Sequence, residues 1–279
     1  MPGRLLDYIQ NLPRIVGGIN RESERRAVEL YQKIVKEKIY STDILTCETS
    51  KTMENAYRDV NIAFANEMAL ICESLGVDVF EVRGLINSRS ERHMHLPGSG
   101  VGGHCLPKDT WLLRYGLQKY GRNNHMETEF INLARRINNS MPTHMSKLIR
   151  SALGEKGITL DDSKVTILGV AYLEDSDDTR NTPAYELIRE LKSYGVEIAA
   201  HDPYVRSFPE APLARTLEEA LVESDCITIV TKHKEYFHLN LKELKEVMRT
   251  PIIVDGRNVL EKKKAIAEGF IYKGIGKGN

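Results

Sequence analysis

The chain has 279 residues, of which 41% are hydrophobic and 28% charged, a composition typical of soluble globular proteins with about two domains. Its formal net charge is +0, which argues against nucleic acid or an anionic membrane surface as a partner. No apolar run approaches the roughly 20 residues of a membrane span, and Arg4 and Asp7 interrupt anything resembling a signal peptide. We therefore expect a cytoplasmic protein.

The first fifty residues indicate an incomplete α/β domain. The segment PRIVGGI (13–19) predicts a strand, and residues 21–38 have the apolar spacing of an amphipathic helix. Together they form one β–α unit, although a parallel sheet needs several such units.

A long helix is predicted next. From Ser50 to about Leu75 the apolar residues recur with helical spacing, Ser50 could cap the start, and Gly76 marks the end. Residues 77–87 read as a second helix, so the middle of the chain is predicted to be all-helical. The long helix suits a dimer interface and suits packing within its own chain equally well.

The glycine-rich stretch LPGSGVGGHCLPKD (96–109) matches the spacing of a dinucleotide-binding loop through Gly98, Gly100 and Gly103. A true phosphate loop of that type follows a hydrophobic strand, and the upstream residues RSERHMHLP do not form one. We therefore interpret the stretch as a backbone cradle around Cys105, whose glycines let N–H groups approach a ligand closely.

Cys105 is predicted to be a nucleophile. Pro107 suits the first turn of a helix, and a helix start just after Cys105 would stabilise its thiolate. Asp109 would then lie one turn along and could act on a water beside the thiol. The alternative is an inert buried cysteine in a glycine-rich turn, as we expect for Cys47, Cys72 and Cys226.

A metal site formed by His93, His95, His104 and Cys105 is disfavoured, because no carboxylate or second cysteine nearby completes a recognised set of metal ligands.

The last third alternates short apolar runs with helical stretches, which predicts a parallel α/β sheet that is doubly wound or close to it. The predicted strands are 164–172, 196–202, 226–231 and 251–256, and the predicted helices between them include 183–194 and 240–249. No glycine fingerprint follows the first strand, so this domain lacks the usual pyrophosphate loop.

Several of these segments resemble one family. PGSGVGGHCLPKD is similar to the nucleophile segment of the UDP-glucose/GDP-mannose dehydrogenases, residues 51–67 to their central helix, residues 177–203 to their UDP-binding domain, and DGRNVL (255–260) to a late substrate loop. The PGRLL opening and VGGHC look most like the branch acting on UDP-N-acetyl-D-mannosamine.

The resemblance implies an NAD-dependent enzyme that oxidises the C6 alcohol of a UDP-sugar in two steps to the uronic acid, a reaction used in polysaccharide biosynthesis. Cys105 matches the nucleophile, which captures the aldehyde as a thiohemiacetal and then carries a thioester. Lys51 matches the proton donor and acceptor, Asn55 an amide that holds oxygen or water, and Asp109 the carboxylate beside the cysteine.

The same resemblance implies a set of binding residues. Those for substrate are Arg58, Arg92, Gly102, Tyr172 and Arg257, and those for NAD are Arg180 and Lys108. One departure concerns Leu173, which stands where the family usually carries a substrate-binding lysine.

The family pattern also implies three regions: residues 1–45 as the remnant of a Rossmann NAD-binding domain, 46–153 as a helical central and dimerisation domain, and 154–279 as a Rossmann-like parallel α/β UDP-sugar domain. Family members open with an NAD-binding domain of roughly 150 residues. We therefore expect this chain alone to be unable to transfer hydride, and expect a homodimer through the long helix, with a separate NAD-binding chain as a further partner. The alternatives are a UDP-glucose or UDP-N-acetylglucosamine dehydrogenase, or a catalytically silent nucleotide-sugar-binding or dimerisation module.

Overall fold

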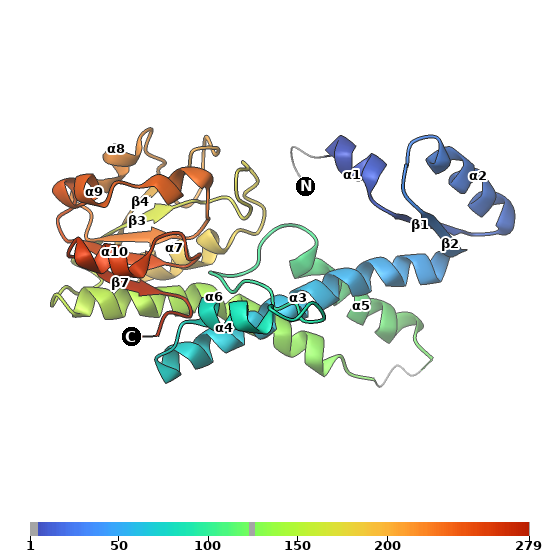
Figure 1. Cartoon of the computed structure of the whole chain (residues 1–279), viewed down its shortest axis with the longest axis horizontal. Coiled ribbons are helices and arrows are strands. Elements are labelled where there is room, and N and C mark those ends of the chain that lie inside the picture. Colours follow the sequence, from blue (N-terminus) through green and yellow to red (C-terminus); the bar gives the residue numbers. More distant parts are fainter. Residues whose placement is uncertain (1–4, 123–125, 279) are drawn as a thin grey trace. The chain divides into compact units, whose positions relative to one another are not determined.

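The computed structural model in Figure 1 describes residues 5–122 and 126–278. Contacts group the chain into two compact units, the first formed by residues 1–57 and 108–127 and the second by 58–107 and 128–279. Helix α3 (Ile44–Leu75) contributes residues to both units. The predicted division at residues 45 and 153 stays a prediction.

The first unit contains one parallel β–α–β arrangement. Strands β1 (Arg14–Gly18) and β2 (Ile39–Asp43) pair in parallel, with α2 (Arg21–Gln32) between them. The predicted strand is confirmed. The predicted helix over 21–38 extends too far, because the chain must leave the helix after Gln32 to return to the start of β2. The remaining helices of this unit are α1 (Leu5–Asn11) and most of α5 (Leu106–Tyr120).

The long helix begins earlier than its sequence indicates. Strand β2 runs directly into α3, and the Asp43 carboxylate accepts the backbone N–H of Thr46 at 2.9 Å, which satisfies a free donor of the first turn. The expected cap Ser50 is wrong: it lies inside the helix, where its hydroxyl donates to the Thr46 carbonyl.

The second unit is built on a five-stranded parallel sheet with the order β4-β3-β5-β6-β7. This order is doubly wound and reverses beside β3, where such sheets bind ligands at the carboxyl ends of their strands. The four predicted strands are present, although the first ends at Leu168 and not at residue 172, and β7 was not predicted. The strands are β3 (Lys164–Leu168), β4 (Glu197–His201), β5 (Cys226–Ile229), β6 (Ile252–Asp255) and β7 (Ile271–Gly274).

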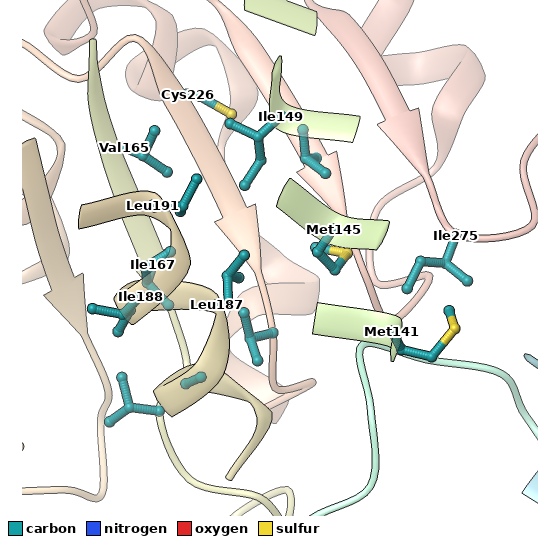
Figure 2. Close-up of a cluster of buried hydrophobic side chains, with 14 of the residues drawn as sticks. Met141, Met145, Ile149, Val165, Ile167, Leu187, Ile188, Leu191, Cys226 and Ile275 are labelled. Atoms are coloured by element: carbon teal, nitrogen blue, oxygen red, sulfur yellow. The ribbon is translucent and has the colours of Figure 1, made fainter. Parts of the chain in front are cut away.

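Helices cover both faces of this sheet. On one face α6 and α7 pack against alternate strand residues, as Figure 2 shows for Met145 and Ile149 of α6 and Leu187 of α7. A second cluster on the other face includes Leu221 of α8 and Leu244 of α9. The helices of this unit are α4 (Val79–Ile86), α6 (Glu129–Gly154), α7 (Pro183–Ser193), α8 (Leu217–Leu221), α9 (Leu241–Val247) and α10 (Lys262–Ala267), with a 3₁₀ turn at Lys234–His238. Among the described residues no helix is long and apolar enough to cross a bilayer.

Candidate functional site

The Cys105 thiol is exposed and stands immediately before α5, as the position of Pro107 predicted. The backbone just before it is fixed to the segment around residues 180–181 of the same unit. Gly103 donates its N–H to the carbonyl of Arg180 at 2.8 Å and accepts the side-chain amide of Asn181 at 3.0 Å. The thiol is therefore held next to a segment that the resemblance assigns to nucleotide binding, and it is not buried.

The glycines before Cys105 are closely packed against other parts of the second unit. A Cβ at Gly102 would lie 2.5 Å from the Cβ of Tyr172, and one at Gly98 would lie 2.5 Å from Nη1 of Arg257. Gly103 has a φ of +85°, a conformation that L side chains rarely adopt. The expected ligand cradle needs correction here, because the N–H groups of Gly98 and Gly103 are bonded within the protein.

A buried chain of polar groups holds the other end of this loop. Asn66 of α3 accepts the Gly98 N–H at 2.9 Å and donates to Asn138 of α6 at 2.9 Å. Asn138 donates in turn to Asp59, which also receives Arg135 at 2.6 Å. All four side chains are almost completely buried. The sequence analysis missed them, although an asparagine on an otherwise apolar helix face is a signal that a buried polar partner exists.

Tyr172, Arg180 and Cys105 lie close enough to influence one another. Burial raises the pKa of Tyr172, and the carboxylate of Asp178 and the thiol of Cys105 act in the same direction while Arg180 opposes them. Arg180 is exposed and engages Asp178 through Nε and Nη2 at 2.9 and 2.5 Å. The Asp178 contact raises the pKa of Arg180, so this guanidinium keeps its charge.

A second group of predicted site residues lies in the first unit, where their side chains are hydrogen-bonded to one another. Asp109 is buried and accepts Asn55 Nδ2 and Lys108 Nζ, each at 2.5 Å. Burial alone would raise the pKa of Asp109, but the hydrogen bonds from Lys108 and Asn55 and the charges of Lys108 and Lys51 hold it below its ordinary value. Asp109 is therefore an ionised carboxylate at neutral pH, suited to orienting a water or a cation.

The remaining predicted residues differ in their surroundings. Lys51 is exposed and pairs with Glu54 at 2.8 Å. Arg58 is exposed and near His95, whose pKa is lowered by burial and by neighbouring cations. Arg92 is exposed on the segment before the glycine loop. Among the described residues, no three His, Cys, Asp or Glu side chains come together as metal ligands.

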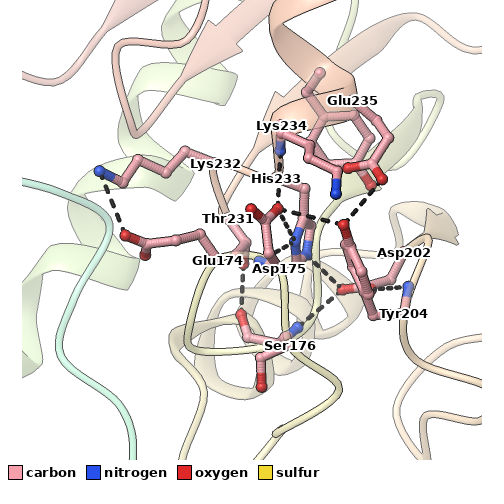
Figure 3. Close-up of polar contacts among 12 residues, drawn as sticks. Glu174, Asp175, Ser176, Asp202, Tyr204, Thr231, Lys232, His233, Lys234 and Glu235 are labelled. Carbon is pink, nitrogen blue, oxygen red and sulfur yellow. Dashed lines mark hydrogen bonds and ion pairs between the residues drawn. The ribbon is translucent and has the colours of Figure 1, made fainter. Parts of the chain in front are cut away.

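A polar network at the carboxyl ends of β3, β4 and β5 was missed by the sequence analysis (Figure 3). His233 is fully buried, and its Nδ1 accepts the backbone N–H of Asp175 at 3.0 Å, so its Nε2 carries the proton that it donates to Asp202 at 3.1 Å. Burial would raise the pKa of Asp202, but His233 and backbone N–H donors hold it below its usual value. The signal was available, since Asp202 ends one predicted strand, His233 comes shortly after another, and the carboxyl ends of parallel strands meet at one edge of the sheet.

Two family models match the chain in the order that its architecture requires. The central domain of the UDP-glucose/GDP-mannose dehydrogenase family matches residues 45–140, and the UDP-binding domain of that family matches residues 166–262. The chain belongs to the UDP-glucose/GDP-mannose dehydrogenase family.

Individual members of this family are similar to the chain over its whole length. The chain is 38% identical over 279 residues to a UDP-N-acetyl-D-mannosamine dehydrogenase of Pyrococcus horikoshii, an alignment that covers 100% of this chain and 63% of the relative. The structure of the UDP-D-ManNAc dehydrogenase from that organism superposes with a TM-score of 0.91, with the same coverage. An NDP-N-acetyl-D-galactosaminuronic acid dehydrogenase of Methanosarcina mazei is 40% identical with a TM-score of 0.93, over 100% of this chain and 61% of that one. The chain thus spans less than two thirds of the length of these relatives.

Proposed function

We propose that this chain carries the thiol and the nucleotide-sugar site of an NAD-dependent UDP-N-acetyl-D-mannosamine 6-dehydrogenase. The observation that carries the proposal is the exposed thiol of Cys105, presented by a backbone that is hydrogen-bonded to residues 180–181 of the segment that resembles a UDP-binding domain. A nucleophile beside a nucleotide site suits a reaction that proceeds through a covalent adduct. The relative from Pyrococcus horikoshii supports the choice of sugar.

The proposed role of Cys105 is to form a C–S bond with the C6 aldehyde and to release the acid when water cleaves the resulting thioester. NAD, when bound, supplies the hydride acceptor for both oxidations. Arg180 fits a role toward that cofactor, since it is exposed and stays charged while one edge of its guanidinium engages Asp178. Lys108, proposed for the same role, is held against Asp109.

Other groups are assigned to proton and oxygen handling. Lys51 is proposed to exchange a proton with the substrate hydroxyl and to stabilise negative charge on oxygen. Asn55 and the ionised Asp109 are proposed to hold the hydrolytic water, because their side chains already form one hydrogen-bonded pair. Substrate contacts are proposed for Arg58, Arg92, Gly102, Tyr172 and Arg257.

The proposal extends to assembly and location. Phe64, Ile71 and Leu75 are exposed apolar residues that lie on one side of α3, because their spacing of seven and four residues returns to the same helix face. A homodimer would cover them, and replacing Phe64 by lysine should then yield a monomer in light scattering.

A chain that brings an NAD-binding domain is a further proposed partner. Because Cys105 must stay a free thiol, a reducing cytoplasm is the proposed location.

Turnover of UDP-sugars tests the proposed function. The protein containing this chain should reduce two NAD for each UDP-N-acetylmannosamine consumed, and Cys105→Ser should lower this ratio and stop acid formation. The matched control is Cys47→Ser, which changes another free thiol and should leave the ratio at two.

The choice of sugar and the silent-module alternative are decided by the same assay. Faster turnover of UDP-glucose, UDP-N-acetylglucosamine or a galactosamine nucleotide would replace the proposed substrate, and the Methanosarcina mazei relative makes the last comparison necessary. Binding of UDP without any NADH formation would favour a nucleotide-sugar-binding module and contradict the proposed enzyme.

A further inference from the structure

Lys232 follows β5 at the edge of the sheet where parallel α/β folds bind ligands. Its two preceding residues are fixed to the loops around it. The Val230 carbonyl accepts the buried hydroxyl of Ser99 from the glycine loop at 3.0 Å, and Thr231 donates to the Ala171 carbonyl after β3 at 2.5 Å. The backbone that carries Lys232 is therefore held where three loops of the second unit meet.

Among the described residues, the ammonium group of Lys232 forms an ion pair with one carboxylate. Its Nζ lies 3.6 Å from Oε1 of Glu174, and Figure 3 shows this pair separate from the hydrogen bonds around His233. The Lys232 side chain is 25% exposed and that of Glu174 is 43% exposed. A partly exposed pair at this separation contributes little stability, so exchanging the carboxylate for another anion costs little.

A second cation lies at the next strand end. Arg257 follows β6, and its Nη1 occupies the space beside Gly98 that a Cβ would need. Burial lowers the pKa of Arg257, whereas the charges of Glu174 and Asp255 act in the opposite direction, which places Glu174 within the field of both cations. Asp255 is itself engaged by three backbone N–H groups of its own loop. Glu174 is therefore an ion-pair partner of Lys232 and also acts electrostatically on Arg257.

We propose that Lys232 binds the diphosphate of the nucleotide substrate, exchanging Glu174 for a phosphate oxygen, with Arg257 on the same group. This inference rests on the proposed function and names a binding residue that the sequence analysis did not identify. Phosphate suits the site because a lysine binds it as a point charge without fixed geometry, and the half-buried stem of Lys232 limits the conformational entropy lost on binding.

Calorimetric titration of the purified chain with UDP, UMP and uridine tests the inference. Lys232→Met should weaken UDP binding by roughly tenfold, the loss expected for one charge-assisted contact, and should reduce the dependence of the affinity on salt. Glu174→Gln should bind UDP more tightly than the unaltered chain, because the competing carboxylate is gone. Uridine, which has no phosphate, should bind Lys232→Met and the unaltered chain alike. Lys263→Met, at an exposed lysine of α10, is the matched control and should change nothing.

The outcomes separate this inference from the proposed function. If the unaltered chain binds UDP and Lys232→Met binds it equally well, Lys232 is not a phosphate ligand, although the proposed function stands. Equal weakening of UDP binding by Lys232→Met and Glu174→Gln, or a loss of uridine affinity in Lys232→Met, would mean that the pair is structural and would also overturn the inference. No UDP binding by the unaltered chain would overturn both.

Discussion

Asn66 accepts the backbone N–H of Gly98 through its side-chain oxygen at 2.9 Å, and this bond joins the interior of α3 to the glycine loop that precedes Cys105. Both groups are buried. The amide nitrogen of Asn66 is engaged as well, by Asn138. One side chain therefore sets the entry of the loop and takes part in a buried polar chain.

Replacing Asn66 by alanine should lower the free energy of unfolding by about 1–3 kcal/mol, because it leaves the Gly98 N–H and the Asn138 oxygen without partners in the interior. Urea denaturation measures the change. Gln118→Ala, at an exposed position of α5, is the control and should lie within about 0.5 kcal/mol of the unaltered chain. A loss for Asn66→Ala no larger than that of the control would mean that water replaces the missing side chain.

The close packing of the glycine loop predicts a contrast between two glycine substitutions. Gly102→Ala should destabilise the chain by about 1–3 kcal/mol, since the new Cβ meets Tyr172 Cβ at 2.5 Å and the Asn181 carbonyl at 2.7 Å. Gly84→Ala, in α4 with nothing within 4 Å, should instead stabilise it by up to about 1 kcal/mol. Thermal unfolding of the two variants should show shifts of opposite sign, and shifts of the same sign would contradict this account.

The carboxylate of Asp109 predicts a pH dependence of stability. Its folded pKa lies below the ordinary value, so folding favours the ionised form; the resulting stability is complete above about pH 4 and is lost as the pH falls through the lower folded value. Asp109→Asn should therefore be less stable than the unaltered chain by about 1–2 kcal/mol at neutral pH, and the difference should shrink below about pH 4. Asp177→Asn, at an exposed carboxyl, is the control. A difference that stays constant with pH would show that Asp109 contributes only through its shape.

His233 is predicted to stabilise the ends of β3, β4 and β5 through both ring nitrogens. His233→Leu should cost about 1–3 kcal/mol, because the buried Asp202 carboxylate loses its donor and the Asp175 N–H loses its acceptor. The same change should raise the pKa of Asp202, which ¹³C NMR of its carboxyl carbon can follow. An unchanged Asp202 titration would indicate that backbone N–H groups alone hold that carboxylate.

The sequence predicted those helices and strands that are determined by residues close together in the chain. Strands such as 226–231 are short apolar runs, and the helix after Cys105 has Pro107 in its first turn; both are present. Strand β2 was missed, because it exists through pairing with β1 and its residues Ile39–Asp43 lack clear alternation. The start of α3 was misplaced for a related reason, since a serine that could serve as a cap also fits inside a helix.

The sequence also predicted part of the candidate site. The likeness of the segment around Cys105 to a known family singled out the thiol, and its exposure agrees with that role. The reason for the glycines could not be predicted from their spacing, because Tyr172 is 70 residues from Gly102 and Arg257 is 159 residues from Gly98, so these side chains meet the loop only after folding. The pairing of Lys232 with Glu174 was hidden for the same reason.

The crowding of Gly102 and Gly103 against Tyr172 has a consequence for how this protein can change over generations. A side chain larger than hydrogen meets Tyr172 Cβ and the Asn181 carbonyl at position 102, and at position 103 it also requires a positive φ, so a smaller residue at 172 would relieve only part of the crowding. The two glycines should accordingly persist while the residues around them diverge, since no single exchange of a neighbouring side chain makes room for a Cβ at either position.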